Sequence, residues 1–206
     1  MRGKFITFEG CEGCGKSTQV RLLSQKLDEL GVEYIVTREP GGSDVAEQIR
    51  KIILDSKNTA MCDECEALLY AAARIQHLKE IVEPALSQGK LVICDRYVDS
   101  SLAYQGYARG LGEEYISEIN SAALKEYCPD LTLFLNISPT DAFARKHGAD
   151  EDDRMEQLGL AFHEKVYQGY LALAAKHPRI CAVDCSGTKF QTAEKIVTLL
   201  KDKGII

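Results

Sequence analysis

A glycine-rich segment near the start of the chain has residue types and spacing suited to binding a nucleoside triphosphate. Residues 10–17 fit the pattern G-x-x-x-x-G-K-[ST] at every fixed position, between a short apolar run and an amphipathic one. In such a loop, consecutive backbone N–H groups donate to phosphate oxygens, the lysine reaches the β- and γ-phosphates, and the serine hydroxyl is a ligand of Mg²⁺. The predicted nucleotide-binding residues are Gly10, Cys11, Glu12, Gly13, Cys14, Gly15, Lys16, Ser17 and Thr18.

A second group of charged and polar residues follows another apolar run, at 91–94. Asp95 ends that run and is expected beside the glycine-rich loop, where it would hold Mg²⁺ directly or through water, while Arg96 would clamp a phosphate. A simple ion pair at a strand end is the alternative. The next polar side chains recur at helical spacing, and an amide among them offers both a donor and an acceptor to a nucleobase edge. These candidate substrate-binding residues are Ser100, Ser101, Tyr104 and Gln105.

Two further stretches carry side chains that suit a nucleotide. Residues 37–42 (T-R-E-P-G-G) come at the end of an expected strand and bring the fixed cation Arg38 to the edge where ligands collect in such sheets. Tyr70 and Arg74 are four residues apart and therefore share a helix face. The ring could stack on a base whose carbonyl accepts from the guanidinium. A core tyrosine with a surface arginine is the alternative.

Alternating strands and helices must position these residues. Five short runs are rich in β-branched or aromatic residues and mostly lack polar alternation, as strands buried on both faces do. The alternation predicts an α/β fold, a parallel sheet with helices on both faces. The expected strands cover 4–9, 33–37, 91–94, 131–136 and 180–184. The expected helices cover 20–30, 43–54 (with Ser43 as the N-cap), 65–86, 115–124, 155–175 and 192–201.

Length and charge limit the class of protein. The chain has 206 residues, and 25 Lys+Arg against 31 Asp+Glu give a net charge of −6. We expect one globular domain, with no broad basic surface for nucleic acid. No apolar run approaches a membrane span, and the start of the chain turns acidic too early for a signal peptide, so we expect a cytoplasmic protein.

Eight cysteines include two C-x-x-C pairs, at 11 and 14 and at 62 and 65. Two such pairs could form a four-thiolate zinc site, and a redox role is a further alternative. The first pair lies inside the glycine-rich loop, however, and disulfides are disfavoured without a secretory signal. We therefore expect reduced, structural cysteines.

The glycine-rich loop alone is compatible with kinases, GTPases, motor ATPases and transporter ATPases. The chain lacks the N-K-x-D motif that reads guanine, and motor or transporter domains are larger and carry further motifs. About 200 residues with little beyond one core favour a small-molecule kinase.

Four segments together resemble the bacterial thymidylate kinases, a family of P-loop nucleoside monophosphate kinases. Each is moderately specific by itself, but they occur in the family's order over most of the chain. They are residues 8–18 (F-E-G-C-E-G-C-G-K-S-T), 37–42 (T-R-E-P-G-G), 95–106 (D-R-Y-x-x-S-S-x-A-Y-Q-G) and 153–156 (D-R-M-E).

The resemblance implies a reaction and an architecture. The γ-phosphoryl group of ATP would be transferred to dTMP with the help of Mg²⁺, giving dTDP and ADP for dTTP biosynthesis. The expected fold is a three-layer P-loop kinase fold with a five-stranded parallel sheet, as one domain over 1–206 with a short lid at about 141–155. Such enzymes are usually homodimers.

The resemblance also implies roles for individual residues. Tyr70 matches the aromatic residue that stacks on thymine, and Tyr104 lies where some members sense the missing 2′-hydroxyl. Glu12 matches a loop carboxylate placed near the acceptor sugar. Residues that match the base-reading groups are Arg74, Ser101 and Gln105. Cations that match those around the nucleotide pocket are Arg38, Arg50 and Arg96, with Arg96 on the acceptor phosphate, and Glu39 and Ser100 complete the expected substrate site.

One more cation over the transferring phosphoryl group is expected, because phosphoryl transfer depends on positioning and charge neutralisation. Some family members supply it from the phosphate loop, where this chain has Gly13. The lid must then supply it. Arg145 is the preferred catalytic candidate, with Lys146 and Arg154 as alternatives.

Two other functions remain open at the level of sequence. The chain could be another nucleoside or deoxynucleoside monophosphate kinase, or a deoxynucleoside kinase, built on the same loop. It could also be a non-catalytic, nucleotide-dependent switch or a zinc-stabilised binding module.

Overall fold

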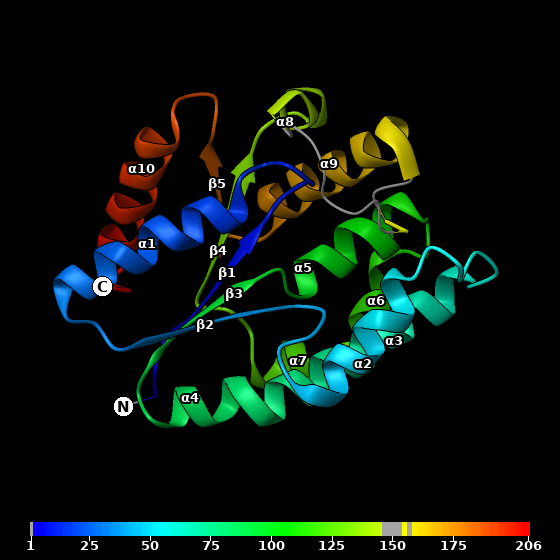
Figure 1. Ribbon diagram of the computed structural model, residues 1–206, viewed down its shortest axis with the longest axis horizontal. Helices are drawn as coiled ribbons and strands as arrows, with labels where there is room; N and C mark the ends of the chain where they lie inside the picture. Colours follow the sequence, from blue (N-terminus) through cyan, green and yellow to red (C-terminus); the bar gives the residue numbers. More distant parts are fainter. Residues whose placement is uncertain (1, 146–153, 156–157) are drawn as a thin grey trace.

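The computed structural model describes residues 2–145, 154, 155 and 158–206. Five parallel strands form one sheet in the order β2-β3-β1-β4-β5 (Figure 1). This confirms the predicted five-stranded parallel sheet, and observed and expected strand ends agree to within one residue. The strands are β1 Phe5–Glu9, β2 Tyr34–Arg38, β3 Leu91–Asp95, β4 Leu131–Asn136 and β5 Ile180–Asp184.

Helices cover both faces of the sheet. In Figure 1, α1 and α10 lie on one side of the strands, and α5 and α9 lie on the other. The α-helices are α1 Lys16–Leu30, α2 Asp44–Leu54, α3 Asp63–His77, α4 Glu83–Ser87, α5 Val98–Ser101, α6 Glu113–Ile119, α7 Ser121–Glu126, α8 Pro139–Arg145, α9 Gly159–Lys176 and α10 Lys189–Asp202. Two π-helical stretches are η1 Leu78–Val82 and η2 Leu102–Ala108.

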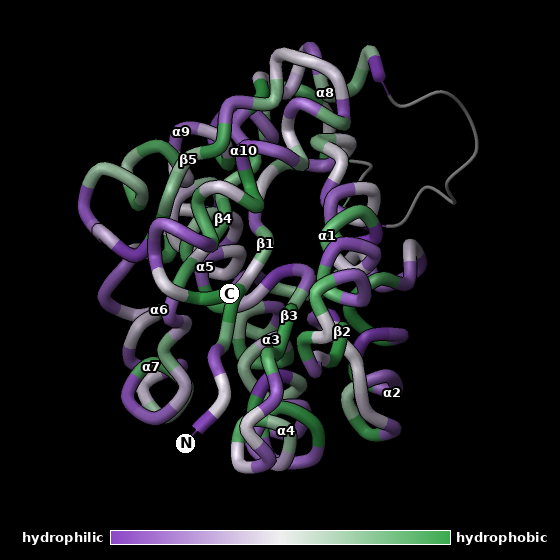
Figure 2. Tube along the Cα trace, turned by 90° about the vertical axis from the view of Figure 1, so that its left-hand side faces the viewer, coloured by the Kyte–Doolittle hydropathy of each residue, from purple (hydrophilic) through white to green (hydrophobic). Residues whose placement is uncertain are grey.

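Alternate residues of each strand feed separate cores on the two faces. On β1, Ile6 and Phe8 pack with α1 and α10, whereas Phe5 packs with η1, α4 and Tyr97. The strands are therefore apolar on both sides, and Figure 2 shows the β3 and β4 stretches largely in the hydrophobic colour. Burial on both faces fixes the carboxyl ends of β1 and β3 side by side, with Phe8 paired to Asp95.

Two helix predictions need correction. The expected helix over 65–86 begins earlier, at Asp63, and continues from α3 through η1 into α4. Acidic side chains in its first turn favour that start, because they complement the helix dipole. The expected helix over 115–124 is broken at Asn120, whose amide donates to the Ile116 carbonyl at 2.8 Å. Ser43 is the N-cap residue of α2, as predicted, although its hydroxyl makes no capping hydrogen bond.

Other boundaries shift by a few residues, and α8 was not predicted. The α8 start is stabilised locally, because the Asp141 backbone N–H donates to the Ser138 hydroxyl at 3.1 Å. Among the described residues, no helix combines the length and the apolar character needed to cross a bilayer.

Candidate active site

The glycine-rich loop leaves β1 and enters α1 through backbone that only glycine adopts without strain. Gly10 and Gly15 have φ of 144° and 96°. A Cβ on Gly10 would also lie 2.8 Å from the Cys14 Sγ atom and 3.1 Å from the Leu135 carbonyl oxygen. The first and last glycines of the motif are therefore required by conformation, and at Gly10 also by close approach.

Lys16 opens α1 and folds its side chain back over the loop. Its Nζ donates to the Gly10 carbonyl at 3.3 Å and to the Cys11 carbonyl at 3.2 Å, and lies 3.6 Å from the Cys14 Sγ atom. Neutral carbonyls and a thiol do not neutralise the ammonium. The charge is thus available to an anionic ligand at the start of α1.

Arg96 follows β3 in a conformation that is uncommon outside glycine, with φ of 68°. Its guanidinium forms an ion pair with Glu12 and donates to the Gly10 carbonyl at 3.1 Å and to the Ser100 hydroxyl at 3.2 Å. An unusual backbone conformation that directs a cation across the phosphate loop is typical of functional sites.

A cavity of about 380 Å³ opens at the carboxyl ends of β1 and β3. Most predicted site residues line it, and these are Glu12, Gly13, Gly15, Lys16, Ser17, Thr18, Arg38, Glu39, Arg50, Tyr70, Arg74, Asp95, Arg96, Ser100, Ser101, Tyr104 and Gln105. Four predicted residues are not in its wall: Gly10, Cys11, Cys14 and Arg145. Pro40, Leu54, Tyr97 and Met155 line it without having been predicted.

Two buried oxygens at this cavity lack hydrogen-bond partners among the described residues: Oδ1 of Asp95 and the hydroxyl of Tyr104. Burying a polar atom without a partner costs about 1–3 kcal/mol, so such atoms commonly mark a ligand's place. Burial also raises the pKa of Tyr104 well above its ordinary value, against the effect of nearby Arg96, and keeps its hydroxyl protonated. Asp95 and Ser17 line the same cavity and form a hard oxygen set that suits Mg²⁺.

Arg74 forms the opposite end of the cavity, and its position is fixed by neighbours on four sides. It is 1% exposed. Its Nε donates to Glu39 at 2.7 Å, and its Nη2 donates to the Tyr97 carbonyl at 3.2 Å and to Ser101 at 3.1 Å. Its Nη1 donates to the amide oxygen of Asn120, the residue that breaks the α6–α7 helix.

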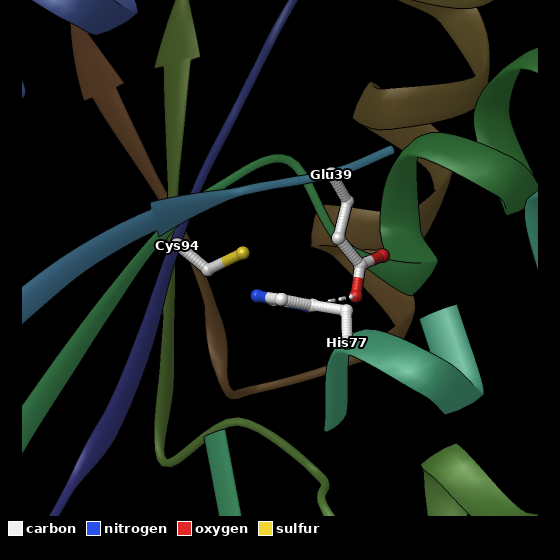
Figure 3. A group of neighbouring side chains, drawn as sticks. All are labelled: Glu39, His77 and Cys94. Carbon is white, nitrogen blue, oxygen red and sulfur yellow. Dashed lines mark hydrogen bonds and ion pairs between the residues drawn. The ribbon is translucent and has the colours of Figure 1, made fainter. Parts of the chain in front are cut away.

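Glu39, which pairs with Arg74, also lies close to His77 and Cys94, and the potential ligand atoms of these three residues are within 4.8 Å of one another (Figure 3). Protein partners already occupy these atoms. The Nδ1 of His77 lies 3.0 Å from Glu39 and its Nε2 lies 2.7 Å from the Thr37 hydroxyl. Burial, followed by Glu39 and Asp95, raises the pKa of Cys94 well above its ordinary value, so the thiol stays protonated. The cluster works as a hydrogen-bonded support for the TREPGG segment.

Other cations at the cavity have acidic or carbonyl partners. Arg38 forms a two-pronged pair with Glu47 at 2.9 and 3.1 Å, and Arg50 donates to the Pro40 carbonyl at 2.9 Å. These contacts attach α2 to the TREPGG segment and keep both guanidiniums at the cavity wall.

Glu9 is a buried residue that supports the cavity wall from behind and that the sequence did not reveal. One of its carboxylate oxygens accepts from the Tyr97 N–H at 2.8 Å, and the other accepts from Ser100 at 2.6 Å and Tyr170 at 2.8 Å. Burial, with the nearby Asp99 charge, raises its pKa to about 7 despite these donors. It ends β1 as Asp95 ends β3, so the signal that identified Asp95 could also have found Glu9.

The three candidate lid cations differ in their surroundings. Arg145 donates to the Cys185 carbonyl at 2.8 Å and does not line the cavity. Lys146 lies outside the described residues. Arg154 is paired with Glu66, a buried residue that the sequence analysis also missed.

The cysteines are free thiols in unlike environments. Cys11 and Cys14 are buried in different cores, whereas Cys62 and Cys65 are exposed at the start of α3. Burial raises the pKa of Cys11 to about 12, which disfavours the thiolate that zinc binding or disulfide exchange requires.

Comparisons with known proteins match nearly the whole chain. A model of the thymidylate kinase family matches residues 8–196. A thymidylate kinase of Latilactobacillus sakei is 52% identical over 96% of this chain and 92% of its own length. One of Clostridium novyi is 48% identical over 97% of this chain and 99% of its own length. The crystal structure of thymidylate kinase from Ehrlichia chaffeensis superposes with a TM-score of 0.78 at 30% identity, covering 97% of this chain and all of that one.

Proposed function

Because the chain belongs to the thymidylate kinase family and is an ATP-dependent kinase, we propose that the cavity at the ends of β1 and β3 transfers the γ-phosphoryl group of ATP to dTMP. The products are dTDP and ADP. The observation that carries this assignment to the cavity is its two unlike ends, one built on Lys16 and Arg96 and the other on Arg74 and Gln105.

At the phosphate end, two polyanions have to approach each other. The loop N–H groups and Lys16 bind the ATP phosphates, and Arg96 binds the acceptor phosphate after exchanging its Glu12 partner for that anion. Glu12 then lies near the acceptor sugar. The acceptor is already an anionic oxygen, so positioning and charge neutralisation supply most of the rate.

Ser17 and Asp95 hold Mg²⁺ in this proposal. The unpartnered, buried Oδ1 of Asp95 supports this role, because an ion or its water would satisfy that oxygen. Bound Mg²⁺ neutralises charge on the phosphates. Asp95→Asn should raise the Mg²⁺ concentration for half-maximal rate about tenfold without changing the secondary structure. An unchanged Mg²⁺ titration curve would remove Asp95 from the metal site.

At the other end, Tyr70 stacks on the thymine while Arg74, Ser101 and Gln105 read its edge. Glu39 supports Arg74, and the unpartnered Tyr104 hydroxyl lies against the deoxyribose. Arg38, Arg50 and Ser100 complete the polar wall. The expected lid of the single domain, at about 141–155, lies largely outside the described residues. In this proposal one cation from that part of the chain, Arg145 in our preferred assignment, neutralises charge on the transferring group.

The test of the substrate is a set of steady-state assays with ATP and dTMP, dUMP, dCMP, dAMP or thymidine as acceptor. We expect kcat/KM to be highest for dTMP. A tenfold advantage for dCMP or thymidine would overturn the substrate assignment and favour the related kinase. Slow ATP turnover that no acceptor accelerates would favour a nucleotide-dependent switch.

We also propose that the protein is a homodimer that acts in the cytoplasm. On α2 and α3, Val45 with Ile52 and Leu68 with Ile75 are apolar pairs seven residues apart, and all four are more than one-third exposed. Two-fold pairing of such faces is the commonest way to cover them. The cytoplasmic location is supported by the eight cysteines, which are free thiols as expected in a reducing compartment. Sedimentation of Leu68→Glu beside the parent chain tests the dimer, because the charge should yield monomers.

A further inference from the structure

The amide of Gln105 is held in one orientation by a buried carboxylate. Its Nε2 donates to the Oε1 of Glu66 at 2.8 Å, and Gln105 and Glu66 are 1% and 0% exposed. Gln105 lies on η2 and Glu66 lies in the first turn of α3. An ionised carboxylate only accepts hydrogen bonds, so the NH₂ group must face Glu66.

Glu66 itself is fixed by two guanidiniums. Arg109 donates its Nε to Oε1 at 3.2 Å and its Nη2 to Oε2 at 2.8 Å, and Arg154 also donates to Oε2. Arg154 is tied in turn to the Ile53 carbonyl at 2.9 Å. These partners compensate the buried charge and prevent the carboxylate from rotating away from Gln105.

The opposite side of the Gln105 amide is its carbonyl oxygen, Oε1. Gln105 lines the cavity, and within the described part of the chain no hydrogen bond is directed to this oxygen. Arg74 contributes the complementary group. Four of its hydrogen bonds go to protein atoms, which leaves one Nη1 hydrogen without a partner among the described residues. The base end thus presents one acceptor and one donor.

We propose that Glu66 is a specificity-determining positioning residue, which commits Gln105 to present an acceptor to the base. The inference rests on the proposed function of the cavity. A pyrimidine with a ring N–H, such as thymine or uracil, donates to that acceptor. The corresponding ring nitrogen of cytosine carries no hydrogen, so its lone pair would face the lone pairs of the Gln105 carbonyl oxygen.

The amide cannot adapt to cytosine by turning over. That rotation would place the carbonyl oxygen of Gln105 against the Glu66 carboxylate and leave two buried acceptors facing each other. Without Glu66, either amide orientation would be accessible. The selectivity therefore comes from a residue that need not touch the substrate.

The test compares the dTMP/dCMP ratio of kcat/KM in the parent chain, Glu66→Gln and Arg109→Lys. In Glu66→Gln, the introduced amide would offer both an oxygen and an NH₂ group to Gln105, so the ratio should fall about tenfold. Most of the change should lie in KM for dCMP. The dTMP/dUMP ratio should stay within twofold, because both bases carry the ring N–H. Arg109→Lys keeps a cation beside the Glu66 carboxylate and leaves the Arg154 pair in place, so its ratio should stay within about twofold of the parent.

An unchanged ratio in Glu66→Gln, or an equal fall in Arg109→Lys, would overturn the proposal even if dTMP remains the best substrate. A parent chain that prefers dCMP would instead overturn the proposed function.

If Glu66→Gln does not fold, NMR of the parent chain labelled with ¹⁵N-glutamine tests whether the Gln105 NH₂ group is hydrogen-bonded. The Gln105 NH₂ signal, identified by its loss in Gln105→Glu, should be protected from hydrogen exchange. Exchange at the rate of exposed glutamines would overturn the inference.

Discussion

The two ends of the cavity are held in different ways. At the phosphate end, the Lys16 ammonium donates to backbone carbonyls and lies near a thiol. Arg96 forms an ion pair with Glu12, a residue of the loop itself. At the base end, Arg74 is locked by Glu39 and Asn120 in the interior. The cations of the first end can exchange these loop partners for an anionic ligand, whereas the Arg74 guanidinium directs four of its five N–H groups to interior protein atoms.

The difference follows from what each end has to recognise. Phosphates are multiply charged, so a cation that leaves a carbonyl for a phosphate gains a stronger, charge-assisted bond. A nucleobase is neutral and offers only a few donors and acceptors. Selection among bases then depends on groups whose orientation is fixed before binding, because a mobile amide or guanidinium would adapt to the wrong base.

Lys16→Ala tests the phosphate end and should have the largest effect. Removing the ammonium takes away stabilisation of charge in the transition state, and we expect kcat to fall by about 10²–10³-fold. Its hydrogen-bond partners are neutral, so the variant should still fold, with the circular dichroism spectrum of the parent chain. Lys26→Ala is the control, because Lys26 lies on the same helix but pairs with exposed Glu29 and does not line the cavity. Equal kcat losses in both variants would contradict this assignment.

Glu9→Gln examines a buried acid that supports the phosphate end through Ser100. The pKa of Glu9 is about 7 in the folded chain, above the usual 4.5, so folding takes up a proton between these pH values. The stability of the parent chain relative to the variant should therefore fall by ~3 kcal/mol as pH rises from about 4.5 to about 7 and stay level above that. Urea unfolding at pH 5 and pH 8 measures the difference.

Glu47→Gln is the control of opposite sign. Slight burial raises the pKa of Glu47, but the Gly42 N–H and Arg38 outweigh it, so the net shift is downward. The parent chain should gain stability relative to this variant as pH rises through the acidic range. A Glu9 difference that does not move with pH would show that the phosphate end carries no buried acid of raised pKa.

The sequence predicted the phosphate end better than the support of the base end. Lys16 and Asp95 follow short local patterns whose geometry is set by neighbouring residues, and both line the cavity. Glu66, Asn120 and His77 have no such pattern. Each acts through a partner more than 35 positions away, and the packing of α3 against other elements brings them together.

Helix boundaries were missed for a related reason. Periodicity predicts where an apolar face lies, but it does not detect a side chain that competes for backbone hydrogen bonds. Asn120 takes the Ile116 carbonyl and ends α6, and in doing so it directs its amide oxygen to Arg74. The irregularity that the sequence pattern did not predict is part of the site.

Arg74→Lys tests whether the base end needs the several N–H donors of a guanidinium or only a positive charge. Lysine keeps the positive charge beside Glu39 but cannot reproduce contacts to Glu39, Asn120 and Ser101 at once. We expect KM for dTMP to rise about tenfold, with kcat reduced less and KM for ATP within twofold. An equal rise in the KM values for dTMP and ATP would indicate that the substitution loosens the whole cavity, and would contradict the assignment of Arg74 to the base end alone.

His77→Leu should have the smallest effect, and it asks how far the support of the base end extends. His77 does not line the cavity, yet its Nδ1 lies 3.0 Å from the Glu39 oxygen that Arg74 does not use. Losing that donor removes about 1 kcal/mol of the hydrogen bonding that holds Glu39, and through it Arg74, in place. KM for dTMP should therefore rise about fivefold with little change in kcat. His77→Gln, which keeps a donor, should recover most of the loss. Thr37→Val removes only the Nε2 partner and should change KM less than His77→Leu does. If all three variants raised KM equally, packing around α3 rather than the Glu39 contact would set the position of Arg74.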